Sequence, residues 1–309
     1  MAVLENIFSW SKSRDEEFQE CRRKYYYSRY ASWGGWDKNA PKKTRAAYVL
    51  KNLKNRWAWK GERVHHAVER VLKTLRSGRT MPLEEAAESL TRQMREDYRS
   101  SKAKKNWENP KNSVGLFEHE YERAVPDEVW RDFHRSSVEC LRHFFESPFF
   151  KELSDDDKTS WLVIEDLEEF DFQDAKVYVK LDFARKKDGK IEILDWKTGK
   201  NDAAAATVQI GAYAIYAMKK WGVSAGDIRA YLVNLGVDQP APAPQAVNEA
   251  LIEETRKIMA QSIGRMRQLL ADPQKNVPLP EDEFPYTDND RLCNFCSFYK
   301  ICGKHNRLV

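Results

Sequence analysis

The 309-residue sequence is long enough for one large domain or two small ones, and it contains 52 lysines and arginines against 48 acids. A formal charge of +4 does not by itself indicate a nucleic-acid partner, and no apolar run approaches the roughly 18 residues of a membrane span. The first residues lack the apolar core of a secretory signal, and five cysteines, an odd number, argue against a disulfide framework. We expect a cytoplasmic protein without a membrane partner.

The N-terminal third contains most of the clustered positive charge. Cys21 precedes the basic, aromatic run RRKYYYSRY, and Lys42 to Arg63 contains eight basic residues and one acid, interleaved with Trp57 and Trp59. Such a stretch can neutralise phosphates and stack bases. The alternative, favoured for any run of charges, is the solvated face of a helix.

Residues 42–75 are predicted to be helical, with a break near Lys60-Gly61. Val64, Val68, Val71 and Leu72 belong to an apolar stripe at helical spacing in the second half of this segment. His65 falls on the edge of the stripe, whereas His66 points the opposite way. Only His65 can project from the core-facing side, although a histidine there is more often a satisfied core residue than a ligand.

The remaining predicted elements are consistent with a single domain. Helices are predicted over 81–105, 125–150, 201–222 and 247–270, and strands over 161–172 and 231–235, with loops at 110–115 and in DQPAPAPQ. Asn201 and Asp202 supply N-cap chemistry for the third helix. We expect a single α/β domain, with helices around a small central mixed sheet. This domain has three parts. Residues 1–160 are largely helical, residues 161–235 form the catalytic core, and residues 236–309 contain the C-terminal helix and the cysteine cluster.

The stretch 177–200 reads as a β-hairpin. Alternating apolar residues on both sides of Asp188-Gly189 indicate two strands, and this dipeptide favours a type I′ turn. If Lys187 pairs with Lys190, Asp182 lies directly opposite Asp195. Two facing carboxylates repel one another unless a cation lies between them.

The hairpin therefore predicts a metal site. Lys197 follows Asp195 by two residues and shares its face of the strand. Two acids and a lysine around a hard cation suit phosphodiester hydrolysis, in which the metal acidifies a water and the lysine holds that water or neutralises developing charge. The alternative is a solvated hairpin with mixed surface charges. Further along, Gln209, Tyr213 and Tyr216 share one face of a helix.

Three cysteines gather near the C-terminus as Cys293-x2-Cys296-x5-Cys302. This spacing lets thiolates bind one metal centre, and Cys21 is the candidate fourth ligand. Zinc held with His305 and chance clustering of free thiols are the alternatives. Cys140 lies among apolar helix residues and is expected to be an inert core cysteine. A centre that joins Cys21 to the tail would connect the two ends of the chain.

Together these residues resemble the RecB-like branch of the PD-(D/E)xK nuclease superfamily, and within it the iron–sulfur nucleases of CRISPR adaptation and of AddAB-type repair enzymes. The motifs that carry the resemblance are Gly61-x3-His65, Lys180-Leu181-Asp182, Asp195-Trp196-Lys197-Thr198-Gly199, Gln209-x3-Tyr213 and the four cysteines. At position 180 a lysine replaces the small residue that is common in the family, and at position 196 a tryptophan replaces the usual tyrosine.

The resemblance implies a restriction-endonuclease-like core and assigns roles to its residues. His65, Asp182, Asp195 and the Trp196 carbonyl would bind Mg²⁺ or Mn²⁺, and Lys197 would orient the attacking water. Glu165 is the additional catalytic acid, with Glu168 also available. Gln209 and Tyr213 would contact DNA, and Cys21, Cys293, Cys296 and Cys302 would hold a [4Fe-4S] cluster in a cysteine-clasped tail.

The expected function is metal-dependent cleavage of DNA, either single-stranded or at its ends, by exonuclease or endonuclease action. The setting would be repair, recombination, CRISPR adaptation or phage defence, with a helicase, a CRISPR integrase or other defence and repair subunits as partners. The chain has no ATP-binding motif of the Walker type. The alternative is a non-catalytic DNA-end-binding or scaffolding subunit, which the presence of His65, Asp182, Asp195 and Lys197 disfavours.

Overall fold

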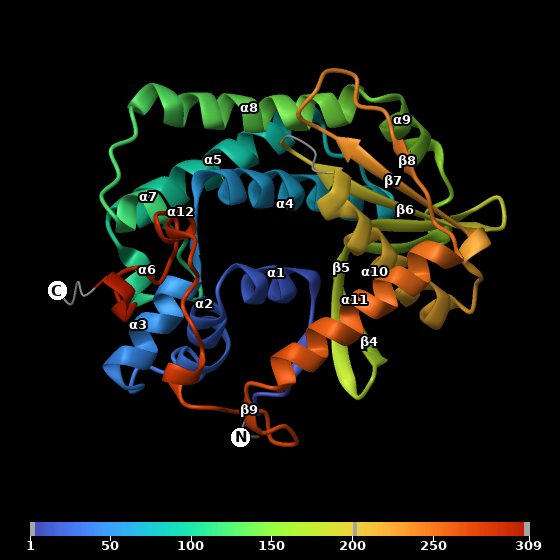
Figure 1. Ribbon diagram of the computed structural model, residues 1–309. Helices are drawn as coiled ribbons and strands as arrows, with labels where there is room; N and C mark the ends of the chain where they lie inside the picture. Colours follow the sequence, from blue (N-terminus) through green and yellow to red (C-terminus); the bar gives the residue numbers. More distant parts are fainter. Residues whose placement is uncertain (1–3, 200–202, 306–309) are drawn as a thin grey trace.

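A mixed six-stranded sheet lies on one side of the protein, on the right in Figure 1, and several helices extend away from it. The computed structural model describes residues 4–199 and 203–305. The sheet has the order β1-β5-β6-β7-β8, and β4 also pairs with β5. Its strands are β1 (Ser9–Trp10), β4 (Trp161–Phe172), β5 (Ala175–Lys187), β6 (Lys190–Lys197), β7 (Ile228–Asn234) and β8 (Ala243–Gln245). The predicted α/β architecture is confirmed.

The long strand β5 organises the sheet. It pairs antiparallel with β4 along most of its length and antiparallel with β6 over its second half. Its first half pairs in parallel with β1, where Ser9 lies opposite Lys176 and Trp10 opposite Val177. The start of the chain is therefore held against the strand that carries Asp182.

Helices flank the sheet. Two short pairs of strands, β2 (Leu53–Lys54) with β3 (Gly115–Leu116) and β9 (Leu270–Asp272) with β10 (Val277–Pro278), lie outside it. The α-helices are α1 (Lys12–Glu20), α2 (Arg22–Tyr26), α3 (Lys42–Lys51), α4 (Arg56–Arg76), α5 (Leu83–Lys102), α6 (Lys105–Glu108), α7 (Phe117–Glu120), α8 (Asp127–Glu146), α9 (Pro148–Asp155), α10 (Ala203–Trp221), α11 (Glu249–Arg267) and α12 (Asp290–Cys293), and a π-helical turn covers Tyr27–Ala31.

The predicted break at Lys60-Gly61 is wrong. The helical region ends at Lys51, and α4 begins after Asn55, whose side chain accepts a hydrogen bond from the Ala58 N–H at 2.9 Å. Gly61 lies within α4 and faces the residue that follows β6. A Cβ on Gly61 would be 3.3 Å from Oγ1 of Thr198. The glycine thus permits a close approach of α4 to the end of β6.

Three other boundaries differ from the prediction. The segment 125–150 contains two helices, because Ser147 caps α9 and Pro148 occupies its first turn. The proline-rich loop contains the edge strand β8, and the tail contains the β9–β10 pair. The N-cap predicted at Asn201 and Asp202 lies outside the described residues.

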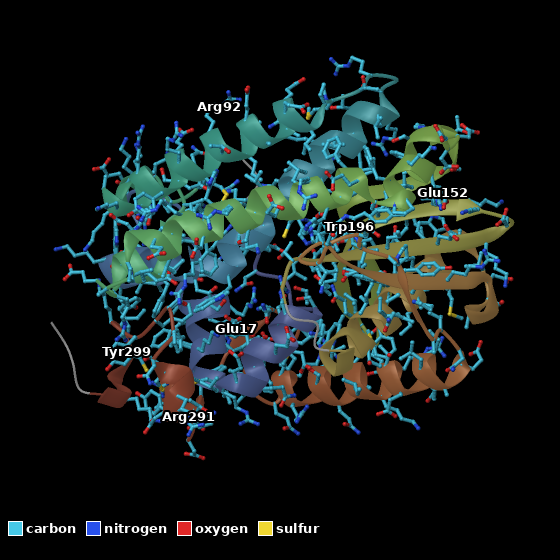
Figure 2. All side chains as sticks on the ribbon, turned by 90° about the horizontal axis from the view of Figure 1, so that it is seen from above. Glu17, Arg92, Glu152, Trp196, Arg291 and Tyr299 are labelled. Carbon is cyan, nitrogen blue, oxygen red and sulfur yellow. The ribbon has the colours of Figure 1, made fainter. Side chains whose placement is uncertain are left out.

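Two hydrophobic cores cover opposite faces of the sheet. One joins the sheet to α10, α11, the N-terminal residues and Phe284, and the other joins it to α4, α5, α8 and α9. Trp196, labelled in Figure 2, belongs to the second core, with its ring 5.6 Å from Phe149 and 5.8 Å from Phe144. Cys140 is buried in the same core, as expected of a structural cysteine.

The first and last parts of the chain contact one another directly. Arg23 donates to the Phe284 carbonyl at 2.8 Å and to the Tyr286 hydroxyl at 3.0 Å. The Tyr27 hydroxyl donates to Glu281 at 2.6 Å and lies 3.2 Å from the Ile301 carbonyl. Hydrogen bonds, the ion pair of Arg23 with Glu281 and the ring contacts of Tyr26 with Phe284 and of Tyr27 with Phe298 thus hold the N-terminal helices against the C-terminal tail.

Candidate active site

The central hairpin has the predicted turn and register. Asp188 and Gly189 have φ of 50° and 74°, as a type I′ turn requires. Lys187 pairs with Lys190, and the same register continues to Phe183 opposite Leu194. One step further along, the Asp182 carboxylate accepts a hydrogen bond from the Trp196 N–H at 2.7 Å. Asp182 is therefore fixed beside the end of β6 that carries Asp195.

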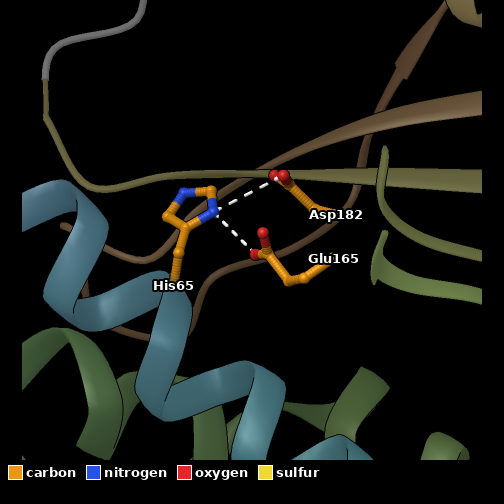
Figure 3. Close-up of side chains that lie close together, drawn as sticks. All are labelled: His65, Glu165 and Asp182. Atoms are coloured by element: carbon orange, nitrogen blue, oxygen red, sulfur yellow. Dashed lines mark hydrogen bonds and ion pairs between the residues drawn. The ribbon is translucent and has the colours of Figure 1, made fainter. Parts of the chain in front are cut away.

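Helix α4 directs His65 at the acids of the sheet. His65 follows Gly61 by about one turn, so the contact of Gly61 with Thr198 brings this face of the helix close to the hairpin. The His65 Nδ1 lies 2.8 Å from Glu165 Oε1 and 3.4 Å from Asp182 Oδ1 (Figure 3). The helical phase that separated His65 from His66 thus identified the ring that lies beside these acids.

Glu165 reaches this cluster through an unusual backbone. It lies in β4 with φ of 55°, in the left-handed region that non-glycine residues rarely adopt. Its side chain is fully buried beside His65, and Lys180 Nζ lies 2.7 Å from its second oxygen. Glu168, the other predicted candidate, lies 3.9 Å from Lys220 and beside Tyr216. Of the two glutamates, the structure brings only Glu165 to the cluster.

The charges of this cluster depend on one another. Burial lowers the pKa of His65, but the charge and hydrogen bond of Asp182, together with those of Glu165, outweigh burial and raise the pKa well above its usual value. Burial raises the pKa of Glu165, and His65 and Lys180 more than compensate and lower it. The two carboxylates therefore favour a positive charge between them and the His65 ring, which is the position of the His65 proton.

A second group of side chains surrounds Asp195. Lys197 Nζ lies 2.5 Å from Asp195 Oδ2 and donates to Gln209 Oε1 at 3.1 Å. The Gln209 amide donates to Asp195 Oδ1 at 3.0 Å and to the Tyr213 hydroxyl at 2.6 Å. Tyr213 in turn donates to the Lys180 carbonyl at 2.5 Å. Gln209 and Tyr213 thus orient both Asp195 and Lys197, and their predicted contact with DNA stays a prediction.

Burial disfavours the charge of Asp195. Burial and the neighbouring Asp182 carboxylate raise its pKa to about 6, although Lys197 and His65 act in the opposite direction. A carboxylate that is both buried and repelled by another carboxylate is poised to gain a cation.

The donor set fits a divalent cation. His65, Glu165 and Asp182 each offer one ligand atom, and these three atoms lie within 4.8 Å of one another. The buried oxygens Glu165 Oε2 and Asp195 Oδ2 each face a lysine ammonium group, that of Lys180 at 2.7 Å and that of Lys197 at 2.5 Å. Carboxylate oxygens with free lone pairs are the ligands that Mg²⁺ and Mn²⁺ prefer. The Trp196 carbonyl stays a predicted ligand.

The raised pKa of Asp195 gives a prediction for the metal-free protein. Because the folded pKa exceeds the unfolded value of about 3.8, ionisation of Asp195 costs stability, increasingly as pH rises from 3.8 to 6 and fully above 6. Asp195→Asn should therefore stabilise the EDTA-treated protein by about 3 kcal/mol at pH 7.5 and by about half of that at pH 5. Urea unfolding of both proteins at the two pH values measures the difference, and an equal effect at both would contradict the assignment.

The four predicted cluster cysteines lie around one small cavity. Cys21 begins α2, whereas Cys293, Cys296 and Cys302 come from the tail, and all four line a cavity of about 30 Å³. Burial raises the pKa of Cys296 to about 12, and Cys302 and Cys21 add to this increase. The side chain of His305, the alternative ligand, lies outside the described residues.

The fold and this site define a class of protein. The mixed sheet brings together Asp182, Asp195 and Glu165 with Lys197 and the helical His65, which are groups that metal-assisted phosphodiester cleavage requires. A sequence model of the PD-(D/E)XK nuclease superfamily matches residues 9–303, so the chain belongs to this superfamily. The α/β fold is accordingly restriction-endonuclease-like, and nucleases of this superfamily typically use divalent metal ions.

Comparisons with curated proteins and with solved structures add less information about the family of this chain. No curated protein matches the chain. Among solved structures, the chain is similar to the one described as "Crystal structure of SSO0001", with 14% identity, a TM-score of 0.29, and coverage of 60% of this chain and 78% of that chain. None of the described helices is long and apolar enough to cross a membrane.

Proposed function

We propose that the protein is a metal-dependent deoxyribonuclease of the RecB-like, iron–sulfur branch, which cleaves single-stranded DNA or DNA ends. The observation that carries this proposal is the convergence of His65, Glu165 and Asp182 within 4.8 Å, beside Asp195 and Lys197. A cavity of about 710 Å³ that is lined in part by Lys180, Gln209 and Tyr213 adds support, because it provides room for a nucleic-acid strand next to these residues.

Each residue would have one task. A divalent cation held by His65, Asp182, Glu165 and Asp195 would polarise the phosphate and acidify a water. Lys197, released from its ion pair with Asp195, would orient that water and stabilise the charge that develops on the phosphate oxygens. Gln209 would keep Asp195 and Lys197 aligned through its two polar atoms.

Two glutamates of β4 provide a matched test. Glu165→Gln removes a buried carboxylate of the cluster, whereas Glu168→Gln removes one that lies outside it. We expect the first substitution to reduce Mn²⁺-dependent cleavage of labelled single-stranded DNA about 100-fold and the second to change it less than about 3-fold. Equal activity of the two variants would exclude Glu165 from the metal site. DNA binding without cleavage by the wild type in any metal would support a scaffolding subunit instead.

We further propose that Cys21, Cys293, Cys296 and Cys302 hold a [4Fe-4S] cluster. Their common cavity supports this, and so does their spacing. Among the described residues, only His65, Glu165 and Asp182 place three metal-binding atoms within 4.8 Å of one another. In any three of these cysteines, at least two sulfurs are therefore more than 4.8 Å apart, which is wider than the roughly 3.8 Å expected around a single tetrahedral zinc and favours a larger centre.

A further inference from the structure

The large cavity beside the active site is lined mainly by the start of the chain. Its volume is about 710 Å³, and Lys180, Gln209 and Tyr213 connect it to the catalytic side chains. Most of the remaining lining comes from the residues before α1, from α1, from α2 and the π-helical turn, and from the end of α3. The N-terminal helices therefore face the site that a substrate strand would occupy.

Basic side chains outnumber acids around this cavity. Five basic residues line it against the two acids Glu5 and Glu16: Lys12, Arg14, Arg29, Lys51 and Lys180. Three of the five have acidic partners, since Lys12 pairs with Glu16, Lys180 with Glu165 and Arg29 with Glu17. Arg14 and Lys51 form no ion pair among the described residues, so positive charge is left over at this wall.

Arg14, Arg29 and Lys51 lie close enough to repel one another. Burial and the charge of Arg29 lower the pKa of Arg14 to about 10 and that of Lys51 to about 8. The buried Nε of Arg29 has no hydrogen-bond partner, although its guanidinium contacts Glu17 at 3.0 Å. Arg14 donates to the Ser9 carbonyl at 3.1 Å and lies over the ring of Tyr178. Crowded, partly buried cations with free donors are suited to an anion.

We propose that Arg14, Arg29 and Lys51 form a phosphate-binding subsite, which holds a phosphate of the substrate strand at a distance from the bond that is cut. This inference rests on the proposed nuclease function and adds to it a specific contact outside the catalytic residues. The parallel pairing of β1 with β5 keeps the subsite aligned with the acids, because Arg14 follows β1 and Asp182 lies in β5. The bound phosphate is either an internal phosphodiester or a terminal monophosphate.

Lys51→Gln tests the subsite, with Lys42→Gln as the matched control. Both lysines belong to α3, but Lys42 is exposed and does not line the cavity. Binding of fluorescent single-stranded DNA is measured in EDTA, so that cleavage plays no part. We expect Lys51→Gln to weaken binding about 5-fold and to reduce the slope of log K against log salt by about 0.7, the value of one phosphate contact. Lys42→Gln should leave both nearly unchanged.

Four single-stranded substrates distinguish the two sources of phosphate. The first has a 5′ phosphate, the second a 3′ phosphate, the third no terminal phosphate, and the fourth is circular. Loss of affinity for only one phosphorylated end would assign a terminal phosphate, and an equal loss for all strands would assign an internal one. The melting temperature of Lys51→Gln should not fall, since a crowded cation has been removed. If the wild type binds DNA and Lys51→Gln binds it equally well, the subsite is refuted, whereas a wild type that neither binds nor cleaves DNA refutes the proposed function itself.

Discussion

Asp195→Asn should reduce metal-dependent DNA cleavage on the order of 10³-fold, which corresponds to about 4 kcal/mol of transition-state stabilisation. The side chain keeps its shape but loses the charge that pairs with Lys197 and that would bind the proposed cation. The measurement is the initial rate on end-labelled single-stranded DNA in Mn²⁺. Because the same substitution should stabilise the metal-free protein at pH 7.5, loss of activity cannot be attributed to unfolding.

Asp171→Asn is the matched control for this experiment. Asp171 is an exposed acid of β4 in the same sheet, and no role in metal binding or catalysis is predicted for its side chain. Its replacement removes the same charge and should leave cleavage within about 2-fold of the wild type. An active Asp195→Asn protein would show that Asp195 does not take part in metal binding.

Cys296→Ser should remove the absorbance of the proposed cluster at about 400 nm and destabilise the protein. A centre that joins Cys21 to the tail closes a very long loop, and its loss should cost roughly 5 kcal/mol, or about 10 °C in melting temperature. Anaerobic purification, iron and sulfide analysis and an absorbance spectrum measure the first effect, and thermal unfolding measures the second.

Cys140→Ala provides the comparison for the cluster. Cys140 is a buried core cysteine that does not line the cavity of the other four. Its replacement should keep the absorbance and the iron content while causing only the modest loss of a small core group. Bound zinc without iron in the wild type, or an unchanged spectrum in Cys296→Ser, would contradict the iron–sulfur assignment.

Local patterns predicted the catalytic hairpin well. The Asp188-Gly189 turn determines which residues pair, so the position of Asp182 beside the end of β6 followed from counting. The identity of His65 followed from the phase of an apolar stripe that a single helix imposes. In both cases the determining interactions join residues that are close in the sequence, 14 positions apart for Asp182 and Trp196.

Long-range contacts were not predictable in this way. Nothing in the alternation of residues 161–172 indicates that Glu165 adopts a positive φ, which requires the surrounding structure to hold it. The ion pair of Lys180 with Glu165 was missed because the sequence offered Lys180 only as a departure from a motif. The positions of Arg14 and Arg29 depend on the parallel pairing of β1 with β5, which joins distant segments and has no local pattern.

The contacts between the two ends of the chain bear on its synthesis. All the proposed catalytic side chains lie before residue 214, but Arg23 and Tyr27, which position the N-terminal helices, bind partners at residues 281–301. As the ribosome makes the chain from its N-terminus, these contacts form only after residues 281–301 have emerged. A chain that stops before residue 281 would contain the proposed metal-binding residues but would lack the partners of Arg23 and Tyr27.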